Sequence, residues 1–453
     1  MARLWLSLLT LTICALAPVS SHPLVERAGP TLPTQDSFYY VPDDIEQYPP
    51  GAILRERKPP APIAAFGLLK ANLKDSRQIL YRTTDSFGRA TATVLTVLVP
   101  HNPDYTKLLS YQIAEDAPTV DCAPSYALQL ASATGGFLGT IITQAEILLI
   151  QAALEQGWII VSPDHQGSKA AFCANELAGH AILDGIRAAL LSSNTTGISK
   201  DPAIALWGYS GGSITSARAA ELQPSYAPEL KILGMAIGGT EPNIANVIND
   251  ANKGPAAGLL PSGFLGLGNE YPVVEEAINA HLKPEYRQAF AKVETQCLLA
   301  NGLDFAFKDV AGMINDLPGL LAQPNISQVI AENNMGYRGV PKMPVFLYKG
   351  VFDEVSAVKD TDDIYDYYCA RGASIQYVRD ALAEHGIAAI TPAPKALLFL
   401  KDVLNGRKQP QGCSRKTVVS SLLDPEVARI LPATILRAML DLIGKPIGPL
   451  SVG

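Results

Sequence analysis

The sequence lacks a block of basic residues, and acidic residues outnumber basic ones. Lysine and arginine total 36 against 43 aspartates and glutamates, which gives a formal net charge of −7. Proteins that bind nucleic acids or anionic membranes usually carry an excess of positive charge on one face. The composition therefore argues against both as partners, and no feature of the sequence predicts a stable protein partner.

The sequence also lacks an internal repeat and, beyond its first residues, a long apolar run. A membrane-spanning helix needs about 18 or more consecutive apolar residues, and no such run lies downstream of residue 21. The first 21 residues join Arg3 to an apolar stretch and then to small residues, which is typical of a cleaved signal peptide. Cleavage at Ala17 or at Ser21 fits equally well. We predict a secreted, extracellular protein.

Cysteine is sparse, with six residues in the chain. Cys14 would leave with the signal peptide, so five remain in an oxidising compartment and at least one stays unpaired. Two sequons agree with export, and we predict glycosylation at Asn194 and Asn325. The five remaining cysteines are Cys122, Cys173, Cys297, Cys369 and Cys413.

Apolar residues, in contrast, make up 48% of the chain, enough to bury a large core. Segments of strand and helix character alternate, which predicts an α/β fold with a largely parallel sheet. Strands are predicted at 91–99, 107–113, 157–162, 203–207, 230–237, 344–348 and 374–378, and helices at 141–156, 179–191 and 213–222.

The alternation is interrupted once. Residues 241–338 have helical character, are punctuated by glycine and proline, and contain no convincing strand. An insertion at this place would form a cap or lid over a site, although a helical side domain of purely structural use is the alternative. We expect an extended N-terminal arm at 22–62, a first core part at 63–240, and a second core part with the C-terminal segment at 339–453.

A glycine-rich stretch lies where a predicted strand meets a predicted helix. Residues 206–213 read L-W-G-Y-S-G-G-S, so Ser210 is the centre of a G-x-S-x-G pattern. A nucleophile elbow needs a strand before the serine, a helix after it and small residues two positions away on each side. The alternative is an ordinary glycine-lined turn. The context favours Ser210 as a nucleophile.

A serine nucleophile requires a histidine base and a carboxylate that orients it, in the chain order serine, acid, histidine for this kind of elbow. Only His281 and His385 follow Ser210. His281 falls on a solvated helix face of the predicted cap, whereas His385 follows the last clear strand. For the acid, Asp353 follows the strand at 344–348, where parallel sheets place their sites, and Glu354 is its competitor.

The reaction also needs donors for the developing oxyanion. The backbone N–H of Gly211, directly after the nucleophile, is the first. The second should come from a loop after an early strand, where Asp116 is either a contributor or a plain turn acid. Asp164-His165 raises the question of a metal, but adjacent residues point apart in a strand and no second cluster completes a site. We therefore predict no metal and no cofactor.

Several blocks together resemble the fungal secretory lipase family, whose members are α/β hydrolases with a helical cap. The likeness runs from about residue 39 to 413 and implies an α/β-hydrolase fold with Ser210, Asp353 and His385 as the triad. It also implies that Asp116 contributes to the oxyanion hole, and it pairs Cys122 with Cys297 and Cys369 with Cys413, which leaves Cys173 free. The blocks are Tyr111-Gln112, Glu115-Asp116, 121–126, 164–167, 170–172, 181–188, 208–212 and 383–385.

Two departures bear on the substrate. The loop after Asp353 reads Glu354-Val355-Ser356-Ala357, without a proline that we associate with lipases of this family, and the residues after about 243 match poorly. The family includes both lipases and trichothecene 3-O-esterases, which remove a short acyl group. We expect a lipase-type hydrolase acting on lipid esters, which an oil–water interface could present, and keep as alternatives a short-chain esterase of that kind and a non-catalytic binding protein.

Overall fold

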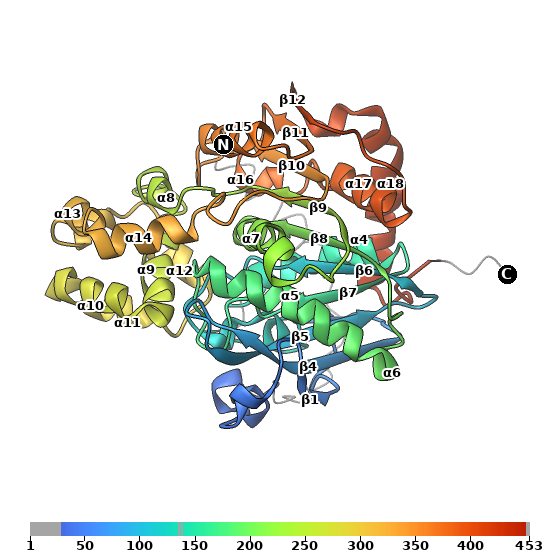
Figure 1. Ribbon diagram of the computed structural model, residues 1–453, viewed down its shortest axis with the longest axis horizontal. Helices are drawn as coiled ribbons and strands as arrows, with labels where there is room; N and C mark the ends of the chain where they lie inside the picture. The colour runs from blue at the N-terminus through green and yellow to red at the C-terminus, as the bar shows by residue number, and fades with distance from the viewer. Residues whose placement is uncertain (1–28, 135, 137–138, 450–453) are drawn as a thin grey trace, which may run out of the picture.

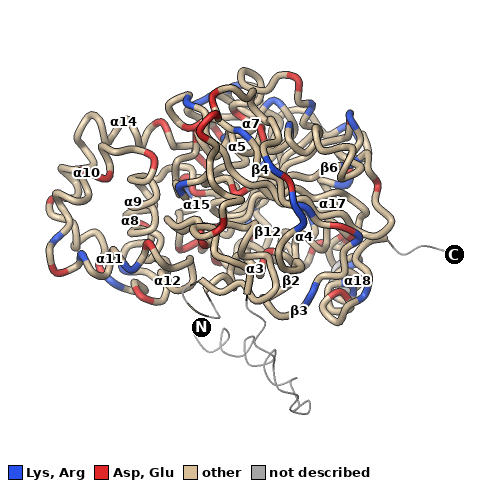
Figure 2. The backbone as a smooth tube through the Cα atoms, turned by 90° about the horizontal axis from the view of Figure 1, so that it is seen from below, with Lys and Arg blue, Asp and Glu red and all other residues tan. Residues whose placement is uncertain are grey.

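The computed structural model describes residues 29–134, 136 and 139–449 (Figure 1). The predicted signal peptide at 1–21 lies outside them. Within the described part of the chain, no helix has both the length and the apolar character needed to cross a membrane. Acidic and basic positions are interspersed along the backbone (Figure 2).

Within the described residues, a twisted sheet of ten strands forms the centre of the fold, in the order β1-β4-β5-β7-β6-β8-β9-β10-β11-β12. The seven strands from β7 to β12 in this order run parallel, while β5, β4 and β1 continue the sheet with antiparallel pairings. The strands are β1 Ile53–Arg57, β4 Asp75–Thr84, β5 Ala90–Val99, β6 Asp104–Gln112, β7 Trp158–Pro163, β8 Ala203–Tyr209, β9 Ile232–Gly238, β10 Val345–Gly350, β11 Ile375–Asp380 and β12 Cys413–Val418. A separate hairpin joins β2 Ala64–Ala65 to β3 Leu69–Lys70.

Helices cover both faces of the sheet, because its central strands are apolar on both sides. One apolar core forms against α5 (Asn175–Leu191), α7 (Gly211–Tyr226) and α15 (Val358–Ala370). The other forms against α4 (Ile147–Leu154) and α17 (Ala393–Leu404), and α18 (Pro425–Leu442) packs on both of these helices. This arrangement gives the predicted α/β class, with a sheet that is mostly parallel.

The segment between β9 and β10 is helical and contributes most of a third apolar cluster, to which Ala171 and Ala174 of the connection between β7 and α5 also belong. In Figure 1 these helices project to one side of the sheet. They are α8 Ile244–Ala251, α9 Leu259–Glu270, α10 Pro272–His281, α11 Arg287–Val293, α12 Leu298–Phe305, α13 Leu317–Leu321 and α14 Pro324–Asn333, with 3₁₀ turns at Pro284–Tyr286 and Ala311–Met313. We refer to residues 241–338 as the helical insertion.

The short elements lie in the connections between these layers. Four are single helical turns: α2 Pro124–Ala127, α3 Ile141–Ala145, α6 Ser193–Thr196 and α16 His385–Ala388. The 3₁₀ turns outside the insertion are Pro33–Gln35, Ser37–Tyr39, Ile45–Gln47, Val120–Cys122 and Ser421–Leu423.

Two local predictions differ from the structure. The described part of the N-terminal arm, residues 29–62, is not simply extended, because it contains three 3₁₀ turns and then β1, which pairs with β4 at the edge of the sheet. The helix predicted at 141–156 is divided into α3 and α4 at Glu146. The Glu146 carboxylate accepts hydrogen bonds from the Tyr111 hydroxyl and the Ala114 N–H, and so ties this break to the end of β6.

Candidate active site

Ser210 lies at a sharp turn between β8 and α7, in a backbone conformation that few residues other than glycine adopt. Its φ is 51° and its ψ −131°. A Cβ atom on Gly208 would lie 2.2 Å from the Gly212 carbonyl oxygen, and one on Gly212 would lie 2.0 Å from the Gln112 carbonyl oxygen. The glycines on both sides are therefore required by close backbone approach, as in a nucleophile elbow.

A hydrogen-bonded chain runs from Ser210 through His385 to Asp353. The Ser210 Oγ lies 2.8 Å from His385 Nε2, and His385 Nδ1 lies 2.8 Å from Asp353 Oδ2. All three residues follow the carboxyl ends of strands within the run β8-β9-β10-β11 of the sheet: Ser210 after β8, Asp353 after β10, and His385 after β11. Because ionised Asp353 can only accept, it fixes the tautomer in which Nδ1 donates and Nε2 is free to accept.

Asp353 is held as an anion by several donors. Its Oδ1 accepts the N–H groups of Val355 and Ser356, and its Oδ2 lies 2.8 Å from the buried ammonium of Lys349. Burial alone would raise the pKa of Asp353, but the charges of His385 and Lys349 and their hydrogen bonds hold it well below its usual range. Asp353 in turn raises the pKa of His385 above its usual value, against the lowering effect of burial.

The alternative acid, Glu354, and the alternative histidine, His281, do not take the places of Asp353 and His385. Glu354 accepts the backbone N–H of His385 at 2.9 Å, so it supports the histidine loop, while Asp353 is the acid that contacts the ring. His281 ends α10 in the helical insertion, where its Nδ1 lies 2.9 Å from the Ala277 carbonyl oxygen of the same helix.

Asp116 lies against the first residue of α7. A Cβ atom on Gly211 would be only 2.1 Å from Asp116 Oδ1, and this buried oxygen has no hydrogen-bond partner in the described part of the chain. Asp116 has a φ of 49°, and Gln166 holds this turn when its amide is oriented to accept the Asp116 N–H at 3.0 Å. Burial, together with the nearby Glu241, raises the pKa of Asp116 well above its usual value.

Sequence reasoning did not single out Glu241 or Lys349. The Glu241 Oε1 accepts a hydrogen bond from the Ser210 hydroxyl at 3.0 Å and lies 3.8 Å from His385 Nε2. Burial raises the pKa of Glu241, an effect opposed by the charges of His385 and Lys349. The available signal was its position, because Glu241 follows β9 just as Asp353 follows β10 at the same edge of the sheet.

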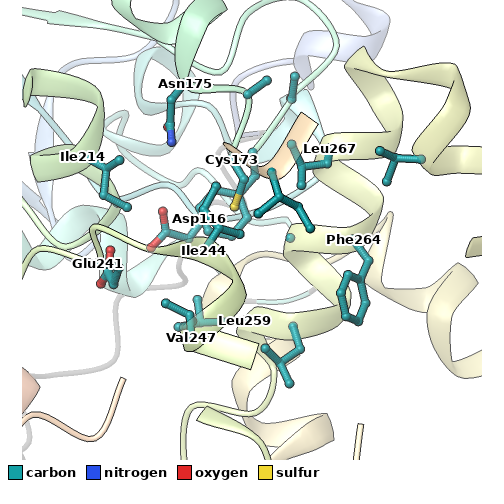
Figure 3. A pocket seen from close by; sticks show the side chains of 18 of the residues that line it. Asp116, Cys173, Asn175, Ile214, Glu241, Ile244, Val247, Leu259, Phe264 and Leu267 are labelled. Carbon is teal, nitrogen blue, oxygen red and sulfur yellow. The ribbon is translucent and has the colours of Figure 1, made fainter. Parts of the chain in front are cut away.

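An apolar pocket begins beside Ser210 and extends under the helical insertion. Asp116, Gly211 and Glu241 line its polar end, and in Figure 3 Phe264 and Leu267 lie on the opposite side from Asp116 and Glu241. The rest of the wall is mostly aliphatic and aromatic. Its contributors from the insertion include Val247, Leu260, Phe264, Leu267, Ile278 and Ile330.

The Asp164-His165 pair has a structural and a pocket-lining role. Asp164 accepts hydrogen bonds from the N–H and the hydroxyl of Ser125, and burial raises its pKa to about 7. His165 lines the pocket, and burial lowers its pKa to about 4, so its ring is neutral near pH 7. Across the described residues, no group of three or more His, Cys, Asp or Glu side chains could hold a metal ion.

Among the described residues, two disulfides are present, Cys122–Cys297 and Cys369–Cys413, with Cys173 unpaired in the pocket wall. This is the pairing that the resemblance implies. Asn194 in α6 and Asn325 at the start of α14 are both exposed, so their glycosylation stays a prediction that the structure leaves sterically open.

The mostly parallel sheet, with Ser210, His385 and Asp353 hydrogen-bonded at the carboxyl ends of its strands, defines an α/β hydrolase. The structure is similar to that of the cell wall degrading esterase LipA from Xanthomonas oryzae, with a TM-score of 0.59 over 80% of this chain and 100% of that one. At 14% sequence identity this similarity concerns the fold alone.

More specific similarities lead to the family. Residues 132–412 match the secretory lipase family, and Lipase A of Arthroderma benhamiae is 45% identical over 94% of this chain and 91% of its own length. The crystal structure of Candida antarctica lipase A in its closed state has a TM-score of 0.80 at 32% identity, covering 93% of this chain and 99% of that one. The chain belongs to the secretory lipase family and is a lipase-type carboxylic-ester hydrolase.

Proposed function

We propose that this protein hydrolyses lipid esters through an acyl-enzyme on Ser210, with His385 as general base and Asp353 as the group that orients it. The observation that carries the proposal is the pair of 2.8 Å contacts that links Asp353 Oδ2 to His385 Nδ1 and His385 Nε2 to Ser210 Oγ. The strained turn at Ser210 supports it, because that conformation exposes a nucleophile above the sheet.

In the first step, Ser210 Oγ forms a bond to the ester carbonyl carbon while its proton moves to His385 Nε2. The π electrons of the carbonyl group move to its oxygen. When the tetrahedral intermediate collapses, the bond to the alcohol oxygen breaks and the alcohol takes the proton from His385. Water then attacks the acyl-enzyme by the same route and releases the acid.

For the oxyanion, we propose the N–H of Gly211 and the carboxyl group of Asp116 as donors. Gly211 is the first residue of α7, so its N–H belongs to the unpaired donors at the positive end of that helix. Asp116 can donate only as a neutral acid, and its burial beside Glu241 favours that form.

We propose that the apolar pocket holds the acyl chain of the substrate. The helical insertion contributes most of the wall of this pocket and would act as its cap. A largely aliphatic wall favours a long chain over an acetyl group, because each buried methylene contributes about 0.8 kcal/mol. Esters with long acyl chains are presented at a lipid–water interface.

The family name supports secretion, and we propose that export uses residues 1–21 as a signal peptide, with glycosylation at Asn194 and Asn325. The boundaries of the N-terminal arm, the two core parts and the cap remain those of the sequence prediction. Mass spectrometry of the secreted protein would give the mature N-terminus and the occupancy of both sequons.

The test compares wild type with Ser210→Ala on p-nitrophenyl esters from acetate to palmitate and on emulsified triglyceride. We expect wild-type rates that rise with chain length, and a loss of at least about 10⁴-fold in the variant. Labelling by an organophosphonate should occur in wild type and be absent in Ser210→Ala, while both proteins unfold at the same temperature.

Other outcomes have definite meanings. If activity is limited to p-nitrophenyl acetate and butyrate, the proposal of a lipid substrate is wrong. The substrate would then be a short-chain acyl ester of a larger apolar alcohol. Equal rates in wild type and Ser210→Ala would remove Ser210 from the mechanism, and an absence of both turnover and labelling would favour a non-catalytic binding protein.

A further inference from the structure

A second carboxylate contacts the nucleophile itself, whereas Asp353 contacts the histidine ring. Glu241 Oε1 lies 3.0 Å from Ser210 Oγ and 3.8 Å from His385 Nε2, whereas Asp353 contacts Nδ1 on the other side of the ring. The Glu241 side chain is only 8% exposed, and it lines the polar end of the substrate pocket. It therefore contacts a reacting atom in a site from which water is largely excluded.

The hydroxyl of Ser210 has one proton and two acceptors within hydrogen-bonding distance, Glu241 Oε1 and His385 Nε2. An anionic Glu241 accepts a hydrogen bond from this hydroxyl, and the proton itself stays on Ser210 Oγ. Once the proton has moved to Nε2, the carboxylate lies within ion-pair distance of the new imidazolium. In a poorly solvated site, a charge at this separation has a large effect on its neighbour.

We propose that Glu241 is a further catalytic residue of this hydrolase, an anionic side chain that shares the Ser210 hydroxyl in the resting enzyme and stabilises the imidazolium of His385 in the transition state. This inference rests on the proposed function of Ser210 and His385. In the step concerned, the Ser210 proton passes to His385 Nε2 as the Oγ–carbon bond forms, and Glu241 neither gains nor loses a proton.

The charges around Glu241 act in both directions. Burial and Asp353 raise the pKa of Glu241, whereas His385, Lys349 and the hydrogen bond from Ser210 lower it and favour the anion, and Glu354 accepts the backbone N–H of His385. Around the pocket end, Asp116 lies near enough to interact with Glu241. Other titratable groups of this region include Tyr209 and Cys173, on which Glu241 acts, His165 in the wall of the same pocket, Glu146, which acts on Asp116, and Glu384, which precedes His385 in the chain.

The sign of the pH effect follows from the charge. An anion beside Nε2 favours protonated His385, so Glu241 raises the pKa of the base and moves the acid limb of kcat/KM to higher pH. Removing the charge should move that limb to lower pH by about one unit, and should lower the plateau kcat roughly tenfold because the imidazolium loses a partner.

The experiment uses two neutral variants that differ in hydrogen bonding. Glu241→Gln keeps an acceptor for the Ser210 hydroxyl, whereas Glu241→Leu has none and suits an apolar pocket if the amide impairs folding. Both are measured from pH 4 to 9 for p-nitrophenyl ester hydrolysis and, independently of substrate binding, for the rate of inactivation by a p-nitrophenyl phosphonate. We expect the same downward shift of the acid limb in both variants and in both assays.

Glu270→Gln is the matched control, because it removes a buried carboxylate of α9 that binds the Ser86 N–H. Its acid limb should coincide with that of wild type. If either Glu241 variant is folded and keeps the wild-type limb, the inference is wrong. Ser210→Ala distinguishes a failure of the proposed function from a failure of this inference. If Ser210→Ala retains activity, the proposed function is wrong. If it is inactive while the Glu241 variants keep the wild-type acid limb, only the role of Glu241 is wrong.

Discussion

At the residue scale, the protonation of Asp116 links the oxyanion site to pH. A carboxyl group can donate to an oxyanion only while it carries a proton, and burial raises the pKa of Asp116 well above its usual value. We therefore expect kcat to fall on the alkaline side, as the pH rises through the raised pKa and the donor is lost. In Asp116→Asn the amide donates at every pH, so this alkaline limb should disappear or move upward.

The magnitude can be tested with Asp116→Ala, which should lose about 10²–10³-fold in kcat at the optimum, the usual effect of removing one oxyanion donor. Asp121→Asn is the control, since this aspartate of the same connection binds Thr34 and lies outside the pocket wall. The measurement is the profile of kcat against pH for wild type, Asp116→Asn, Asp116→Ala and Asp121→Asn. An alkaline limb retained in Asp116→Asn would assign it to another group.

The residues that the sequence made predictable were those with few competitors of the same type. Two histidines follow Ser210, so chain order and strand position were enough to single out His385, which the structure places 2.8 Å from Ser210 Oγ. Glu241 and Lys349 have many equivalents among 43 acidic and 36 basic residues, and the one signal, the place of Glu241 directly after a strand, does not by itself distinguish it from them. Their positions depend on strands brought together by the sheet, which no short stretch of sequence records.

At the element scale, α9 has a glycine, Gly263, where the helix faces the pocket. Gly263 lines the pocket, and a Cβ atom there would meet only the Cys173 sulfur, at 3.5 Å, so a larger side chain would extend into the acyl space. Gly263→Phe should reduce kcat/KM for p-nitrophenyl palmitate about tenfold or more and leave that for butyrate within about twofold, because a blocked methylene site costs 1–3 kcal/mol.

A matched substitution separates pocket blocking from general damage to the insertion. Gly302 in α12 has open space beside it and does not line the pocket, so Gly302→Phe adds the same side chain elsewhere in the insertion. Its chain-length profile should match wild type. An equal loss on butyrate and palmitate in Gly263→Phe would mean that the pocket does not hold the acyl chain.

The elements that the sequence did not reveal are mostly at the margins of the sheet. Inner strands such as β7 and β8 are buried on both faces and read as apolar runs, which is why they could be predicted. The edge strands β1 and β12 are I-L-R-E-R and C-S-R-K-T-V, and β12 is almost wholly exposed. Charged edge residues discourage pairing with other chains, and they also erase the apolar pattern by which strands are predicted.

At the scale of the whole molecule, the fold class could be predicted because strand and helix segments alternate over the core, whereas the packing of the insertion could not. The insertion shares its apolar cluster with Ala171 and Ala174 of the core and is also anchored to the core by polar contacts of α7. The buried Arg218 of that helix binds the carbonyl oxygens of Glu332 and Asn334 at the end of the insertion and pairs with Glu176 of α5. Such contacts depend on tertiary structure alone.

The two disulfides should differ in their contribution to the stability of the whole molecule. Cys122–Cys297 joins the core to the insertion across 175 residues, whereas Cys369–Cys413 closes a segment of 44 residues within the second core part. In the chain-entropy treatment a longer closed loop restricts the unfolded chain more, and the ratio of these lengths corresponds to about 1 kcal/mol. Cys122 and Cys297 are also the more buried pair, so their loss removes more packing.

We therefore expect Cys122→Ala/Cys297→Ala to lower the free energy of unfolding by about 1 kcal/mol or more beyond the loss in Cys369→Ala/Cys413→Ala, each loss lying within about 2–5 kcal/mol. Denaturant unfolding of the secreted, oxidised proteins measures both, with Cys173→Ala as the control for removing a sulfur without a cross-link. Equal losses, or the reverse order, would contradict the view that the longer link stabilises the molecule by restricting its unfolded chain.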